Sequence, residues 1–134
     1  MVTTTSEFEA QFGRDLIDQT LNRVLGVYAS LFANAWDPLR KNEVLAPVLK
    51  DLEGVDANPL LDLLEHASIM TLHSALNHFT SFENEGAGYS LSVRVCRGPE
   101  QACDLLDYVD WPGGYLVSEE GWVEEFLDYR ETAP

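Results

Sequence analysis

The sequence predicts an α+β fold in which a mainly helical N-terminal two thirds packs with a small antiparallel sheet and a C-terminal helix. Two patterns favour this fold. Apolar residues recur three or four positions apart over residues 8–32, 38–52 and 59–82, as they do along one face of an amphipathic helix. Over residues 89–96, apolar and polar residues alternate instead, which is typical of a strand with one buried face.

Length and composition predict a single globular domain over residues 1–134. With 46% hydrophobic residues, a chain of this size buries about two thirds of the surface that its unfolded form exposes. Within this domain we expect a helical part (about 6–82) and a part with the sheet and an acidic helix (about 88–131). No linker or repeat separates the two parts. No apolar stretch follows the polar start MVTTTS, and no run approaches the roughly 18 apolar residues of a membrane span. We therefore expect a cytoplasmic protein without membrane contact.

The first helix has a recognisable start and end. Ser6 and Glu9 predict a capping box at its start. An Asp-Pro pair after Trp36 predicts that it ends near that residue. Gly13 and Gly26 each cost about 1 kcal/mol relative to alanine inside a helix, so we expect them to mark places where another part of the chain packs closely.

The second and third helices differ in their expected burial. Pro47 lies inside the apolar pattern of residues 38–52, so this helix either kinks there or begins at about Ala46, and Gly54 closes it. The third helix, over residues 59–82, has apolar residues nearly all round its first half. This pattern predicts the central and most buried helix of the protein.

Short elements are predicted to follow the strand. Residues 100–106 are expected to form a short helix. Pro112-Gly113-Gly114 suits a type II turn, so residues 108–111 and 115–117 are predicted to form a hairpin that joins the strand in one sheet. Ser118 is expected to cap a last helix with Trp122 on its inner face.

The strongest functional signal is the charge of residues 99–131. This segment has ten carboxylates and one base, so a net charge of −9, out of −15 for the whole chain. With 23 acidic against 8 basic residues, direct binding to nucleic acid or to an anionic membrane is disfavoured. Two interpretations remain: the charge keeps the protein soluble, or it attracts a basic partner.

No arrangement of residues predicts catalysis, a cofactor or a metal. His66 and His73 are two turns apart on one helix, about 10 Å, which is too far for one ion without ligands from elsewhere. Cys96 and Cys103 lack the spacing of a zinc knuckle and are expected to be buried or half-buried free thiols. Ser74 lies beside His73 but outside any GxSxG motif.

The acidic residues form two rows by spacing. Four of them fall on one stripe of the predicted last helix, about 5–6 Å apart, and three more recur at every third position before it. The simpler explanation of these rows is a helix face exposed to solvent. The more specific explanation is a surface that binds a partner. The predicted partner-binding residues are Asp104, Asp107, Asp110, Trp111, Glu119, Glu120, Glu124, Asp128 and Glu131.

These features predict a non-enzymatic inhibitor that mimics nucleic acid and blocks the basic, nucleic-acid-binding surface of a partner protein. An anti-CRISPR or anti-restriction protein of a phage or plasmid, or an immunity protein against a nuclease toxin, has such a charge and size. The likeness is one of charge and size, not of sequence motif. The alternatives are an adaptor that forms a homodimer through residues 8–32, and a small metal-binding enzyme that uses His66 and His73.

Overall fold

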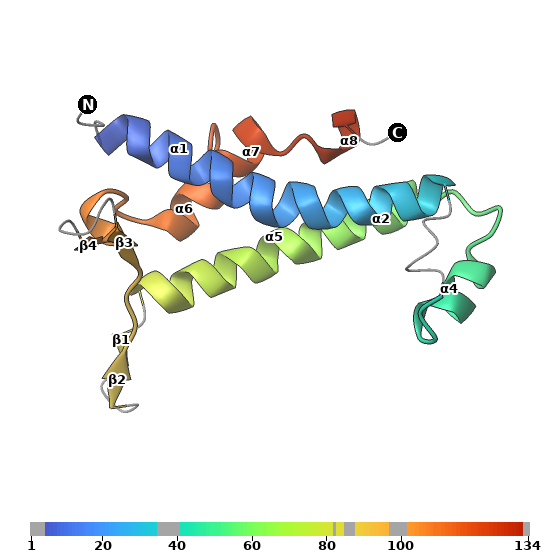
Figure 1. Cartoon of the computed structure of the whole chain (residues 1–134), viewed down its shortest axis with the longest axis horizontal. Helices are drawn as coiled ribbons and strands as arrows, with labels where there is room; N and C mark the ends of the chain where they lie inside the picture. Colours follow the sequence, from blue (N-terminus) through green and yellow to red (C-terminus); the bar gives the residue numbers. More distant parts are fainter. Residues whose placement is uncertain (1–4, 35–40, 82, 85–87, 97–101, 133–134) are drawn as a thin grey trace.

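The fold is α+β and mainly helical, as predicted. The computed structural model describes residues 5–34, 41–81, 83–84, 88–96 and 102–132. Two long helical rods lie side by side, and the remaining elements pack along them or extend from their ends (Figure 1).

The first rod is continuous but not uniformly α-helical. It consists of α1 (Thr5–Ile17), a π-helical turn η1 (Asp18–Asn22) and α2 (Arg23–Asn34). The rod begins one residue before the predicted cap Ser6, and its predicted end near Trp36 lies outside the described residues. The π-helical turn, which the periodicity did not predict, carries Asn22, whose side chain bonds to the backbone of the C-terminal segment.

The second rod is α5 (Asn58–Ser81), close to its predicted bounds. The short helix α4 (Leu45–Asp51) begins one residue before Ala46, so Pro47 falls in its first turn, where a proline does not disrupt the helix. The helix ends before the predicted Gly54, with Leu52 as its C-cap; Gly54 has φ 78°, a left-handed conformation that glycine adopts without strain, in the turn that follows.

The prediction that α5 is the most buried helix is wrong. Its residues Leu61 and Leu76 belong to the buried cluster shared with the first rod and the C-terminal segment, whereas Leu63 is 64% exposed and Met70 is 46% exposed. Apolar residues around a whole helix therefore do not mark a central position here, because the chain has too few elements to surround it.

The strands form two separate two-stranded sheets. In the first sheet, β1 (Glu83–Asn84) pairs antiparallel with β2 (Tyr89–Ser90). In the second, β3 (Arg94–Cys96) pairs antiparallel with β4 (Ala102–Asp104), with Val95 opposite Cys103. The predicted single strand over residues 89–96 is thus interrupted, although Leu91, Val93 and Val95 are less exposed than the polar residues between them.

The short helix predicted over residues 100–106 is wrong where the structure describes it. Residues 102–104 belong to β4, and only the next residues turn, as a 3₁₀ helix η3 (Leu105–Asp107). Pairing with β3 explains the difference, because the backbone of residues 102–104 is hydrogen-bonded to a neighbouring strand and not to its own next turn. Residues 100–101 lie outside the described part.

The predicted hairpin over residues 108–117 is also wrong. Residues 112–117 form the helix α6 (Pro112–Val117), with the proline in its first turn, where it needs no N–H partner. The two glycines allow close packing of other side chains and do not form a turn. A Cβ on Gly113 would overlap the side-chain amide of Asn77 on α5, and a Cβ on Gly114 would overlap the indole of Trp111.

The predicted last helix is broken into two. After α7 (Trp122–Phe126), Leu127 is extended, with φ −76° and ψ 108°, and α8 (Tyr129–Thr132) follows. The break has a tertiary cause: the side chain of Asn22 in η1 bonds to the backbone on both sides of it. Nδ2 donates to the Phe126 carbonyl (2.9 Å), and Oδ1 accepts from the N–H groups of Asp128 (2.9 Å) and Tyr129 (3.1 Å).

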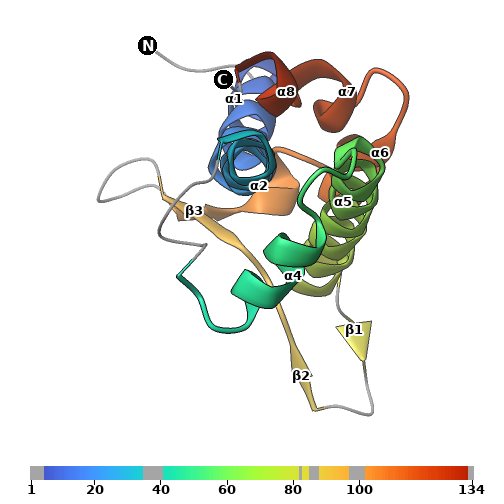
Figure 2. The same ribbon diagram turned by 90° about the vertical axis from the view of Figure 1, so that its right-hand side faces the viewer.

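The C-terminal segment lies across both rods and supplies half of the core. Helix α6 packs on α5, α7 on α1 and α8 on α2, so the segment bridges the rods on one side (Figure 2). Six of the eleven residues in the buried cluster come from it, which makes this segment part of the folded body and not an appended tail. These six are Leu105, Val109, Leu116, Trp122, Phe126 and Tyr129.

Gly13 and Gly26 provide a matched test of this packing. A Cβ on Gly13 would overlap the Trp122 ring, whereas a Cβ on Gly26 would meet nothing within 4 Å. We expect Gly13→Ala to lower the free energy of unfolding by about 1–3 kcal/mol, because the indole must shift. Gly26→Ala should raise it by about 0.5–1 kcal/mol through helix propensity. Urea unfolding of both variants tests this, and a stabilising Gly13→Ala would contradict the packing.

Asn22 is predicted to determine how the C-terminal segment docks. Asn22→Ala removes one donor and one acceptor from the backbone of residues 126–129, and we expect the free energy of unfolding to fall by about 1–3 kcal/mol. The control is Asp18→Asn, since exposed Asp18 also accepts from Asn22 Nδ2 (2.9 Å) but contacts no backbone across the break. This control should change the free energy of unfolding by less than about 0.5 kcal/mol. Equal effects of the two substitutions would contradict the assignment.

Candidate protein-binding site

Trp111 is the exposed aromatic residue of the described acidic segment. Its side chain is 58% exposed, whereas Trp122 is 3% exposed, Tyr129 is 1% exposed and Phe126 is also buried. The segment therefore folds with its other aromatic residues against the rods and leaves one indole at the surface. Exposed tryptophans of this kind are frequent centres of protein interfaces.

A hollow of about 330 Å³ lies beside Trp111. Its walls are Asp110, Trp111, Gly114, Tyr115 and Ser118, from the start of α6 to the residue after its end. Because the indole lies over the Cα of Gly114, where a Cβ would overlap it, the ring rests on the backbone of α6. The hollow is thus shaped by one short helix and the ring at its N-terminus.

Tyr115 connects this hollow to the first rod. Its ring stacks on that of Trp122, with centroids 5.7 Å apart and an angle of 21° between the planes. Its hydroxyl lies near enough to the carboxylate of Glu9 of α1 for that charge to act on it. The negative charge of Glu9 is the main cause that raises the pKa of Tyr115 above 10.0, followed by burial and the charge of Asp110. Both carboxylates therefore disfavour a negative charge on the Tyr115 hydroxyl, beside the hollow.

Glu9 and Tyr115 are site residues that the sequence did not reveal. Glu9 was expected to close a capping box, and Tyr115 to lie in a strand. The two residues are 106 positions apart in the chain, and only the docking of the C-terminal segment on α1 brings them together. No local pattern contains that information.

Asp104 and Asp107 have a structural role in η3. Asp104 Oδ1 accepts from the N–H of Leu106 (3.0 Å), and Asp107 Oδ2 accepts from the N–H of Asp104 (3.2 Å), which is a complete capping box. These two carboxylates are therefore tied to the turn after β4. Asp110, three residues further, is exposed at the hollow.

The predicted acidic stripe on one helix is wrong as a geometry. Glu120 lies before α7 with φ 58°, and its N–H donates to Glu124 Oε2 (3.0 Å), so Glu124 closes the turn between α6 and α7. Asp128 and Glu131 come after the break at Leu127 and follow a different helix axis. All these carboxylates and Glu119 are exposed, but they follow a folded surface and not the straight row of one helix.

Arg130, the basic residue of the acidic segment, interacts with other parts of the protein. Arg130 forms an ion pair with Asp62 of α5, and its Nε donates to the Tyr129 hydroxyl (2.9 Å). That hydroxyl donates in turn to Glu65 Oε1 (2.9 Å). The network fixes α8 to α5. Arg130 is therefore paired with a carboxylate of another helix and not with one of the acidic segment.

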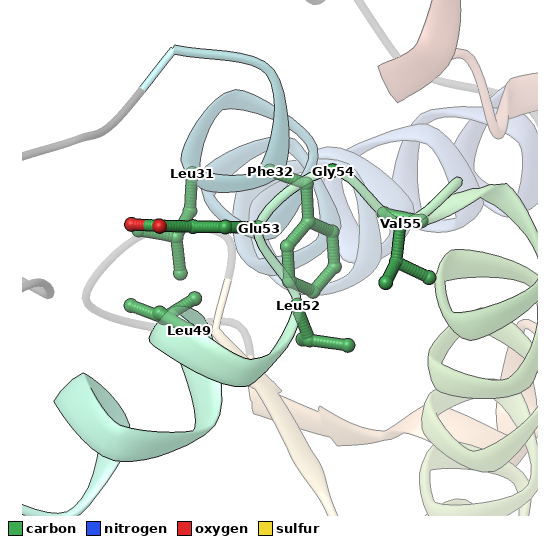
Figure 3. Close-up of a pocket in the computed structure, with 8 residues that line it drawn as sticks. Leu31, Phe32, Leu49, Leu52, Glu53, Gly54 and Val55 are labelled. Carbon is green, nitrogen blue, oxygen red and sulfur yellow. The ribbon is translucent and has the colours of Figure 1, made fainter.

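Other hollows lie at the opposite end of the rods. One of about 210 Å³ lies between the end of α2 and α4, where Phe32, Leu49, Leu52 and Val55 converge (Figure 3). A second of about 210 Å³ adjoins it and shares Phe32 and Ala57. Both are smaller than ordinary ligand pockets, and the first has one carboxylate, Glu53, in its wall. The second has Asp56 and Asn58 in its wall.

Metal ligands do not gather in the described part of the chain: it contains no group of three or more His, Cys, Asp or Glu residues that could hold an ion. Cys96 and Cys103 are free thiols, the first exposed, against expectation, and the second half-buried. None of the described helices is both long and apolar enough to cross a membrane.

Comparison of the chain with models of protein families, with curated proteins and with solved structures found no match.

The Tyr129 network predicts how stability depends on alkaline pH. Burial raises the pKa of Tyr129 above 10.0, the hydrogen bond from Arg130 opposes this shift, and the bond to Glu65 adds to it. A raised pKa in the folded state contributes stability below pH 10 that is lost as the pH rises through the folded-state value. We expect Tyr129→Phe to reduce the loss of unfolding free energy between about pH 8 and about pH 11.

The control for this prediction is Tyr89→Phe, since Tyr89 is 55% exposed and lies in β2, away from α8. Urea unfolding at each pH measures the effect. If Tyr129→Phe and Tyr89→Phe keep the same pH dependence as the unaltered protein, the Tyr129 network does not control alkaline unfolding.

Proposed function

We propose that this protein is a non-enzymatic inhibitor whose acidic C-terminal segment occupies the basic, nucleic-acid-binding surface of a partner protein. The observation that supports this most is the way in which the segment folds. Trp122, Phe126 and Tyr129 are buried together with Leu105, Val109 and Leu116, while Trp111 and most of the carboxylates are exposed. A fixed surface of this kind loses little conformational entropy when it binds.

The proposed contact surface includes only some of the carboxylates of the acidic segment. Asp104, Asp107 and Glu124 already accept backbone N–H groups within the chain, so binding would compete with their capping role. Exposed carboxylates without such a bond to this segment's backbone are better suited to pair with lysine and arginine. Among these carboxylates we assign Asp110, Glu119, Asp128 and Glu131 to the contact surface, and Trp111 adds a ring for a desolvated contact.

The dimerising adaptor is less well supported. The apolar residues Ile17, Leu21 and Leu25 of the first rod, through which that dimer was expected to form, are buried within the chain. A dimer would need another surface, such as Leu63 and Met70 on α5. Concentration-dependent dimerisation in sedimentation equilibrium, unchanged by salt, would favour the adaptor.

The proposal is tested by capture from a lysate of the source organism on the immobilised protein, with elution in steps of rising salt. We expect a nucleic-acid-binding protein that elutes sharply and is displaced by added DNA or RNA, because both ligands would use one basic surface. Release of many basic proteins at low salt, without competition by nucleic acid, would contradict it.

A charge variant locates the binding surface. Neutralising the four exposed acids as Asp110→Asn, Glu119→Gln, Asp128→Asn and Glu131→Gln should weaken binding of the captured partner by on the order of tenfold, mainly through a slower association rate. Asparagine at position 128 preserves a good residue before α8, so the fold should not change. The measurement is the association rate at several salt concentrations.

The matched control removes an equal number of negative charges, four, from another surface. Asp15, Glu43, Asp51 and Glu53 are exposed on α1 and around α4, and the control replaces each by its amide. We expect it to slow association less than the C-terminal variant does, because only long-range attraction is lost. Equal slowing by both variants would mean that net charge, and not this surface, determines binding.

A further inference from the structure

The hollow beside Trp111 combines three features that the acidic surface in general does not have. It is a hollow, two of the five residues that line it, Trp111 and Tyr115, are aromatic, and a third, Asp110, carries a carboxylate. At about 330 Å³ it is at the lower limit of ligand pockets, so it suits one long side chain better than a metabolite.

The chemistry of the walls selects a cation. Aromatic faces attract cations through their quadrupole, and Glu9 and Asp110 both act on the Tyr115 hydroxyl with negative charge. An anionic or purely apolar group would gain less, because the first is repelled and the second leaves Asp110 without a counter-charge. The ring of Trp111 lies over Gly114 on the α6 backbone, which holds a flat surface ready for stacking.

We propose that this hollow binds an arginine side chain of the partner. The guanidinium stacks on the Trp111 indole and donates hydrogen bonds to the Asp110 carboxylate, and the methylene stem lies against Tyr115. Arginine fits better than lysine because its group is planar, stacks on aromatic rings and matches a carboxylate with two donors. The proposal rests on the proposed function, since a basic nucleic-acid-binding surface is the source of such an arginine.

The test is a titration of the isotope-labelled protein with N-acetyl-arginine amide at physiological salt, followed by NMR. Trp111→Phe identifies the indole N–H signal of Trp111 without removing an aromatic ring. We expect saturable shifts of that signal and of the Gly114 and Tyr115 amides, with a dissociation constant in the millimolar range. The corresponding citrulline amide, which is neutral and of similar shape, should produce no saturable shift.

Two further variants separate the hollow from the general charge. Asp110→Asn should weaken binding of the arginine amide about fivefold. Glu125→Gln removes one exposed charge from α7 outside the hollow and should leave the affinity unchanged. Equal shifts with citrulline, equal weakening by both variants, or shifts spread evenly over the acidic surface would overturn the proposed arginine site.

The titration uses no partner protein, so a negative titration can be distinguished from a negative result of the partner capture. If arginine amide does not bind but a nucleic-acid-competed partner is captured, the arginine site is wrong and the inhibitor function stands. If arginine amide binds at Trp111 but no such partner is captured, the site is supported and the inhibitor function is contradicted.

Discussion

The side chain of Asn22 connects the first rod to the C-terminal segment, and the rest of the arrangement depends on that connection. One amide satisfies a carbonyl at the end of α7 and two N–H groups at the start of α8. Without it, these backbone groups at the break would lose their partners. The break at Leu127 allows Phe126 and Tyr129, three positions apart, both to be buried. The π-helical turn η1 positions Asn22 for this task, and such turns are frequently functional in proteins.

Folding of the segment resolves the conflict between its charge and its hydrophobicity. Ten carboxylates within 33 residues repel one another, and this repulsion opposes compaction. The structure offsets part of it by using Asp104, Asp107 and Glu124 as acceptors for backbone N–H groups, and by pairing Arg130 with Asp62. Burial of Trp122, Phe126 and other apolar side chains supplies the main stabilisation. The remaining carboxylates stay exposed, and we propose that they meet a basic partner.

Sequence patterns predicted the long helices and failed for the short elements of the C-terminal segment. Periodicity over about twenty residues defines the two rods because many positions agree, as around α5. The helix α6 could not be predicted, because Pro112-Gly113-Gly114 has the composition of a turn. Its glycines are explained by contacts with Asn77 and Trp111 that exist only in the folded chain.

The candidate site was predictable in part. Composition identified the acidic segment and included Trp111 among its candidates, and the helical pattern placed Trp122 on an inner face, but neither gave the exposure of the two rings. Their difference, 58% against 3% exposed, comes from the space that Gly13 leaves for the Trp122 ring. Likewise, the approach of Glu9 to Tyr115 is a long-range consequence of docking.

The most direct test of the account is whether the partner can bind nucleic acid and this protein at once. Analytical ultracentrifugation of the captured partner with labelled nucleic acid, at increasing concentrations of this protein, distinguishes the outcomes. Competition for one basic surface predicts release of free nucleic acid and no ternary complex. A stable ternary complex of this protein, the partner and nucleic acid would contradict the account, because this protein would then bind the partner outside its nucleic-acid-binding surface.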